Sequence, residues 1–187
     1  MNTSLFRPFL LALLASTTLF SACKDDNEDP TPDEDNEQIT TVTYTLTPTG
    51  GGTPVTVQYR DLDGDGGAAP TIGTLTLAPN TTYTGTLELK DETKTPAENT
   101  TAEIQEKGDE HLFWFEPSGT NLTITRTDKD KNNLEIGLTT RAVTGAANAT
   151  GTTGTLKITL RHQPGSKNGT FAPGSTDVEV NFPTVVR

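Results

Sequence analysis

The chain has 187 residues, of which 38 are threonine and one is cysteine, and its formal net charge is −11. This length is sufficient for one domain with its own hydrophobic core. The acidic balance gives nucleic-acid binding little support, and a lone cysteine excludes a disulfide framework within the chain.

The N-terminal segment has the pattern of a secretory signal peptide. Residues 9–20, FLLALLASTTLF, form an apolar run that follows Arg7, the only charged side chain before Lys24. The run is too short to span a bilayer, which takes about 20 apolar residues, and two small residues follow it. We therefore predict a signal peptide over residues 1–22; the alternative is a buried helix.

The only cysteine stands directly after this segment. Its context, LFSAC, resembles the lipobox of bacterial lipoproteins, although Phe20 occupies the position where the lipobox usually has Leu. In that motif the thiol is diacylated and the cysteine becomes the new N-terminus. The resemblance predicts that Cys23 carries a lipid anchor; the alternative is a free thiol in an uncleaved leader.

An acidic segment follows the cysteine. Residues 24–38, KDDNEDPTPDEDNEQ, hold eight acidic residues, one lysine and two prolines. Such a stretch cannot bury enough apolar surface to fold, so we predict that residues 23–38 form the lipidated cysteine and a disordered tether. Lys-Asp-Asp after the cysteine resembles the export signal of Bacteroidota surface lipoproteins, which implies the outer membrane and the cell surface. The alternative is a solvated spacer.

Residues 39–187 are predicted to form a single all-β domain. Apolar residues alternate with polar ones, mostly threonine, whose branched side chain suits a pleated sheet. Clusters of Gly, Pro and Asn separate the segments. The alternating residues are Val42, Tyr44 and Leu46; Val55, Val57 and Tyr59; Tyr83, Leu87 and Leu89; Leu122 and Ile124; Leu134, Ile136 and Leu138; Leu156, Ile158 and Leu160; and Val178, Val180 and Phe182. We predict an antiparallel, immunoglobulin-like β-sandwich of about eight or nine strands with at most one short helix.

Three segments depart from simple alternation. The phase shifts in TIGTLTL, which predicts a β-bulge near Gly73. HLFWFEP (residues 111–117) has large apolar side chains on both faces, which predicts a central strand or a strand with one face covered. The one predicted helix is NTTAEIQEKG (residues 99–108), where Thr100 and Glu103 have capping-box spacing, and this helix could be the cover.

Two loops carry acidic residues at alternate positions. RDLDGDGG matches the first half of an EF-hand calcium loop, but the glutamate that closes such a loop is missing. TDKDKNN repeats the spacing. The candidate calcium ligands are Asp61, Asp63 and Asp65 in the first loop and Asp128, Asp130 and Asn132 in the second. The alternative is a pair of ordinary turns, in which Asp and Asn side chains bond to the backbone.

Four polar residues extend the apolar faces of predicted strands. They are His111, His162, Arg126 and Asp61. If these strand ends converge, the four side chains form a polar site or a metal site. The alternative is a hydrogen-bonded cap on the core, because two histidines without a third ligand make a poor zinc site.

Several stretches together resemble a group of small Bacteroidota lipoproteins of unknown function. They are RDLDGDGGAAP, NTTYTGTLEL, DEHLFWF, TDKDKNN and TGTLKITLRHQP, and they span most of residues 40–182. Proteins of that group are often labelled type 1 periplasmic binding fold superfamily, a name for two α/β lobes, whereas the pattern here predicts antiparallel strands. The resemblance implies an extracytoplasmic lipoprotein and brings no catalytic residue with it.

The sequence contains no nucleophile elbow, phosphate loop or zinc-binding helix motif. We therefore predict a non-enzymatic module, anchored to the outer membrane by its lipid, that binds a glycan, a small ligand or a partner protein. The alternatives are a structural or accessory envelope component that works with a membrane transporter and, less favoured, a small hydrolase that uses Asp and His.

Overall fold

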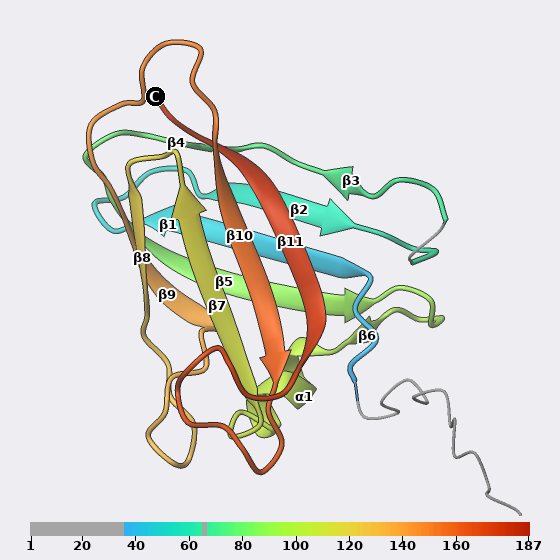
Figure 1. The fold of residues 1–187 in the computed structure, drawn as a ribbon. Coiled ribbons are helices and arrows are strands. Elements are labelled where there is room, and N and C mark those ends of the chain that lie inside the picture. The colour runs from blue at the N-terminus through green and yellow to red at the C-terminus, as the bar shows by residue number, and fades with distance from the viewer. Residues whose placement is uncertain (1–35, 65–66) are drawn as a thin grey trace, which may run out of the picture. The chain divides into compact units, whose positions relative to one another are not determined.

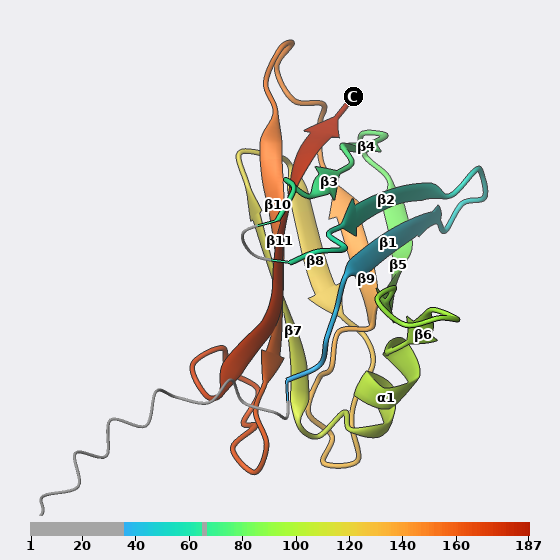
Figure 2. The same ribbon diagram turned by 90° about the vertical axis from the view of Figure 1, so that its right-hand side faces the viewer.

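The computed structural model describes residues 36–64 and 67–187, and all of them belong to one unit, Pro32–Arg187. Within these residues two β-sheets pack face to face, and one short helix lies at one end (Figure 1, Figure 2). The predicted all-β sandwich is therefore confirmed. The predicted signal peptide, Cys23 and most of the predicted tether lie outside the described residues, as does Asp65.

The larger sheet contains seven strands among the described residues. Their order is β3-β2-β1-β5-β9-β8, with β6 beside β5. All of their pairings are antiparallel. The strands are β1 (Thr41–Pro48), β2 (Val55–Arg60), β3 (Thr71–Ile72), β5 (Thr82–Asp91), β6 (Glu98–Asn99), β8 (Leu122–Arg126) and β9 (Thr139–Thr144).

The smaller sheet has the order β4-β11-β10-β7. Its strands are β4 (Leu75–Leu77), β7 (His111–Ser118), β10 (Gly154–His162) and β11 (Ser175–Val186). The short β4 runs parallel to β11, and the other pairings are antiparallel. Eight strands of the described residues have five or more residues, which agrees with the predicted eight or nine.

The core lies between the two sheets and follows the predicted alternation. Val42, Tyr44 and Leu46 of β1 are buried in the same cluster as Leu156 and Leu160 of β10. Burial of each such side chain stabilises the fold by about 1.5–3 kcal/mol. The buried Tyr44 hydroxyl lies 2.7 Å from the Thr140 hydroxyl, so its polar group keeps a partner, and burial raises the pKa of Tyr44 to about 12.

The predicted bulge near Gly73 is instead a change of sheet. Ile72 ends β3 in the larger sheet, and Leu75 begins β4 in the smaller one. The Gly73 N–H still donates to the Gln58 carbonyl at 2.9 Å, and a Cβ on Gly73 would stand 3.0 Å from a Val57 methyl carbon. The alternation shifts its phase because Ile72 is exposed while Leu75 faces the core.

The predicted strand at residues 134–138 is wrong, because apart from an isolated β-bridge between Glu135 and Lys129 this segment is irregular, and the strand, β9, begins only at Thr139. Gly137 has a φ of 102°, which breaks the extended conformation. The Asp128 carboxylate accepts hydrogen bonds from the N–H groups of Gly137 and Leu138, at 2.8 and 2.9 Å. Ile136 and Leu138 are buried in the core, so their alternation reflects burial outside a regular strand.

The aromatic segment HLFWFEP forms β7, which lies at an edge of the smaller sheet. Both faces are covered at its first half, where Leu112 and Phe113 have no exposed surface. The outer face is covered by the loop before β11, because the Phe171 ring packs edge-on against Trp114 at a centroid distance of 5.8 Å. Arg161 in turn stacks over Phe171, 4.7 Å from the ring centroid. A loop, not the helix, provides this cover.

The helix, α1 (Thr101–Glu106), packs against the end of β5 and buries Ile104 in the core. Thr100 stands at the N-cap, but its side chain makes no capping hydrogen bond, so the predicted capping box is not formed. The Thr101 hydroxyl instead accepts a hydrogen bond from the Leu89 N–H at 2.8 Å. In the described part of the chain no helix is long and apolar enough to cross a membrane.

Candidate functional site

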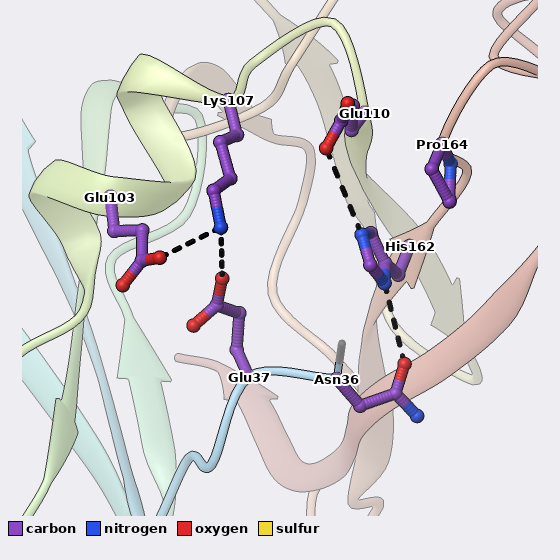
Figure 3. Close-up of a pocket in the computed structure, with 7 residues that line it drawn as sticks. All are labelled: Asn36, Glu37, Glu103, Lys107, Glu110, His162 and Pro164. Atoms are coloured by element: carbon purple, nitrogen blue, oxygen red, sulfur yellow. Dashed lines mark hydrogen bonds and ion pairs between the residues drawn. The ribbon is translucent and has the colours of Figure 1, made fainter. Parts of the chain in front are cut away.

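The end of the sandwich at which α1 lies, here called the base, carries a polar pocket of about 360 Å³. The last turn of α1, the end of β10 and the chain that leads into β1 all meet there (Figure 1, Figure 2). The residues that line this base pocket are Asn36, Glu37, Glu103, Lys107, Glu110, His162 and Pro164 (Figure 3). Strand ends and a helix terminus thus bring together residues from three separate parts of the sequence.

The structure brings the two predicted histidines together. His111 begins β7, His162 ends β10, and the two are direct partners across the strand pair. Their rings stack with centroids 4.9 Å apart and an interplanar angle of 11°. Because two positive charges at this distance repel each other, a charge on His162 disfavours protonation of His111.

His111 is completely buried. Its Nδ1 lies 3.0 Å from the Lys107 carbonyl, so Nδ1 carries the proton and donates, and in the neutral ring Nε2 is left as an acceptor. Burial lowers the pKa of His111 to about 4, although the hydrogen bond to Lys107 opposes this. His111 is therefore neutral at pH 7.

Asp177 lies beneath His111, with Oδ2 3.7 Å from His111 Nε2 and no exposed side-chain surface. Neither Asp177 oxygen has a hydrogen-bond partner within the described structure. Burial and the nearby charge of Glu37 raise the pKa of Asp177 to about 7, while Arg161 opposes them. The base thus contains a buried carboxyl group that changes its charge close to neutral pH.

Sequence reasoning missed Asp177, because alternation with Val178 and Val180 places it on the outer face. The pairing of β10 with β11 shows why: Leu160 pairs with Val178 and Arg161 pairs with Thr176, so Asp177 is the extra residue of a β-bulge. A bulge re-aims the side chain that it carries. The only sequence signal is an acid beside an apolar run, which is too common to identify such a residue.

Charged side chains in the base pocket pair with one another (Figure 3). Lys107 Nζ lies 2.8 Å from Glu103 and 3.7 Å from Glu37, and the hydrogen bond to Glu103 raises the pKa of Lys107. His162 Nε2 lies 4.0 Å from a Glu110 oxygen. Burial, followed by the charge of Glu103, raises the pKa of Glu37.

The last three residues of the predicted tether contact the domain. Asn36 Oδ1 accepts a hydrogen bond from the Ser175 hydroxyl at 3.0 Å and lies 3.4 Å from His162 Nδ1. The Glu37 side chain is only 11% exposed where it meets Lys107. These contacts are polar, and composition reveals only apolar content. The sequence therefore assigned residues 36–38 to the tether.

A second cleft of about 410 Å³ adjoins the base on the side of β2 and β11, and is here called the side cleft. Its lining residues are Gln38, Ile39, Tyr59, Asp61, Gly64, Thr176, Asp177, Val178 and Glu179. Asp61 accepts hydrogen bonds from the Tyr59 hydroxyl and the Gly64 N–H. Asp61 therefore lies beside Asp177 in the side cleft and does not line the base pocket.

Arg126 does not join the histidines, which corrects the predicted polar site. Its guanidinium donates to Glu135 at 2.7 Å and to the Phe113 carbonyl at 3.1 Å, and lies over the Trp114 ring. These residues belong to a separate pocket between β7 and β8. Arg126 stands on the larger sheet and His111 on the smaller one, a separation that strand alternation cannot reveal.

The described carboxylates of the two acidic loops accept hydrogen bonds, most of them from backbone N–H groups of the same loop. Asp61 and Asp63 accept backbone N–H groups of Gly64 and Ala68. Both oxygens of Asp128 accept backbone donors, as described above, and Asp130 accepts the Leu134 N–H and the Lys167 ammonium. Asn132 is exposed.

The turn interpretation therefore accounts for the described carboxylates in both loops. Across residues 36–64 and 67–187, no three His, Cys, Asp or Glu side chains are grouped as a metal ion requires. Calcium binding stays a prediction, because the first loop includes Asp65, which the structure does not describe.

Comparison with protein-family models, curated proteins and solved structures finds no match for this chain. The resemblance to Bacteroidota lipoproteins stays a prediction. The geometry of the base and of the side cleft is thus the basis for any functional assignment.

Proposed function

We propose that this protein is a non-enzymatic binding module, held on the outer membrane by a lipid on Cys23 and displayed at the cell surface. The observation that carries the binding role is the pair of polar clefts at the base of the sandwich. The last residues of the predicted tether line both of them, because Asn36 and Glu37 line the base pocket and Gln38 lines the side cleft. A ligand in either cleft would contact the place where the domain joins its anchor.

The chemistry of the base pocket favours recognition over reaction. Lys107 has a raised pKa and is held between two carboxylates, so it is a fixed cation rather than a nucleophile. His162 is 4.0 Å from Glu110, which exceeds hydrogen-bond length. The pocket offers carboxylate acceptors beside ammonium and imidazole donors. Because a hydroxyl group both donates and accepts hydrogen bonds, a hydroxyl-rich ligand such as a glycan matches this lining best.

Binding of soluble oligosaccharides to the purified full chain tests this proposal. We expect an oligosaccharide to perturb the NMR signals of Lys107, Glu110 and His162. Glu110→Gln should weaken binding at least about tenfold, because a hydrogen bond to a charged group contributes about 1.5–3 kcal/mol.

The matched control is Glu116→Gln. Glu116 lies on β7, the strand that begins directly after Glu110, but it pairs with Lys157 and lines none of the pockets described here. The control should bind as the native chain does. A ligand that binds equally well to both variants, or a broad panel with no ligand at all, would contradict the assignment to this pocket.

A further inference from the structure

We propose that the base is a proton-operated latch, which holds residues 36–38 against the sandwich while the buried His111–Asp177 pair carries a proton and releases them when that proton leaves. The latch rests on the proposed function in one respect: release of residues 36–38 would let the domain move more freely on its proposed membrane tether.

Residues 36–38 make polar contacts at the base. Asn36 meets Ser175 and His162, Glu37 meets Lys107, and Gln38 lines the side cleft. Two residues further on the attachment is firm, since the Thr40 N–H donates to the Lys90 carbonyl and the Thr40 carbonyl accepts from the Asp61 N–H. Release can therefore end at Thr40 without opening the sheet.

The His111–Asp177 pair lies directly behind this segment. Asp177 is the bulged residue of β11 and lies two residues after Ser175, the donor to Asn36. Both Asp177 oxygens and His111 Nε2 are buried without hydrogen-bond partners in the described residues. With one proton the pair is neutral, whether that proton resides on the carboxyl group or on the imidazole.

Loss of the proton leaves a negative charge in the interior, where a carboxylate without a partner is strongly disfavoured. Glu37 is the acid that raises the pKa of Asp177, so the two carboxylates repel once both are ionised. Movement of Glu37 away from the base relieves this repulsion and also admits water to Asp177. Both effects favour release of the segment as the pH rises through about 7.

The other charged groups around the pair do not cancel this effect. Lys107 and Lys167 face His111 and disfavour its protonation. Arg161 opposes the raised pKa of Asp177, but its N–H groups donate to loop carbonyls, among them Pro173, and to the Thr176 hydroxyl. Glu103 and Glu110 lie across the base pocket, beside Lys107 and His162 respectively.

Backbone NMR of the purified full chain between pH 5 and 9 tests the latch. We expect the amides of Glu37 and Gln38 to be rigid at low pH and to become more mobile as the pH rises toward about 7, the pKa of Asp177 in the docked state. For one proton, the ratio of released to docked segment should rise by up to about tenfold per pH unit below that pKa and level off above it, because both states have then lost the proton. The Ser175 amide should report the same change, because the Ser175 hydroxyl donates to Asn36.

Two substitutions weaken the latch, and a third is the control. Asp177→Asn removes the ionisation and should keep the segment docked across the whole range. Glu37→Gln removes the repulsion that drives release and should make the rise in mobility with pH smaller than in the native chain. Asp109→Asn is the control, because Asp109 pairs with the exposed Lys131, and it should leave the pH response unchanged.

The latch is overturned if residues 36–38 show no change between pH 5 and 9, or if their pH-dependent change is as large in Glu37→Gln as in the native chain. The second comparison decides the matter even if Asp177→Asn fails to fold. Neither result depends on lipid attachment or on glycan binding. Failure of the latch is therefore distinguishable from failure of the proposed function.

Discussion

At the scale of single residues, His111 and Asp177 make opposite contributions to the pH dependence of stability. Burial lowers the pKa of His111 to about 4 from an ordinary value of 6.5, and raises that of Asp177 to about 7 from 3.8. Between about pH 4 and 6.5 the pair therefore holds one proton in the folded state and one in the unfolded state. Its net contribution to the slope of stability with pH is close to zero.

Single substitutions should make each residue's own effect on the pH dependence of the unfolding free energy measurable. In Asp177→Asn, His111 with its lowered pKa remains, so stability should fall as the pH falls from about 6.5 to 4. In His111→Gln, Asp177 with its raised pKa remains, so stability should fall as the pH rises from about 4 to 7. Each slope should approach about 1.4 kcal/mol per pH unit.

Urea unfolding at pH 4.5, 5.5 and 6.5 measures both slopes. The native chain, in which the two effects cancel, is the reference for the other groups that titrate in this range. Slopes of the same sign in the two variants would contradict the assignment of opposite pKa shifts.

At the scale of elements, a buried ion pair fastens the loop before β11 to the turn before β9. Lys167 Nζ lies 2.8 Å from Asp130 and 2.7 Å from the Gly108 carbonyl, and both charged side chains are 1% exposed. Burial alone would raise the pKa of Asp130, but the Lys167 ammonium and the Leu134 N–H outweigh it and lower that pKa. The same loop carries Phe171 and covers the outer face of β7.

Lys167→Met should destabilise the domain by about 3–5 kcal/mol, because it leaves the Asp130 carboxylate buried without its cation. The double variant with Asp130→Asn should recover part of this loss. Lys131→Met is the matched control. Its ammonium pairs with Asp109 at the same distance of 2.8 Å but is 72% exposed, so it should cost less than about 1 kcal/mol.

Urea unfolding of the three variants at pH 7 measures these differences. Equal effects of the buried and the exposed lysine would show that the loop is not fastened by this pair. Because the folded pKa of Asp130 is lowered, its contribution should be present above about pH 4 and be lost as the pH falls further.

At the scale of the whole molecule, the proposed anchor depends on one atom, the Cys23 thiol. Cys23→Ala should abolish incorporation of a labelled fatty acid into the protein and should release it from the membrane fraction. Ser16→Ala, in the apolar run of the predicted signal peptide, is the control and should retain the label. Fatty-acid labelling followed by gel separation measures the result.

Surface display is tested on the same cells. Protease added to intact cells should remove the native protein, because the proposal places the domain outside the outer membrane. Label retained in Cys23→Ala would contradict the lipid site, and a protein resistant to the protease until the cells are lysed would contradict surface display.

The sequence by itself determined the sandwich and most of its core. Alternation with threonine placed Tyr44, Leu156 and Leu160 on inward faces, because a strand has a side-chain period of two and one face must leave water. The same parity placed His111 on an inward face, where the structure has it. Inferences of this kind use only local periodicity, which the chain carries in every strand.

Tertiary structure decided the positions at which that periodicity breaks. Gly73 marks a change of sheet, the segment before β9 bends at Gly137 where Asp128 accepts its N–H, and a bulge turns Asp177 inward. Each depends on a partner outside the segment itself, so alternation within the segment does not specify it. The stacked histidines and the buried acid of the base come together because β7 and β11 begin where β10 ends. Alternation cannot show which strand ends meet, so the sequence predicted a polar site but included a wrong member, Arg126.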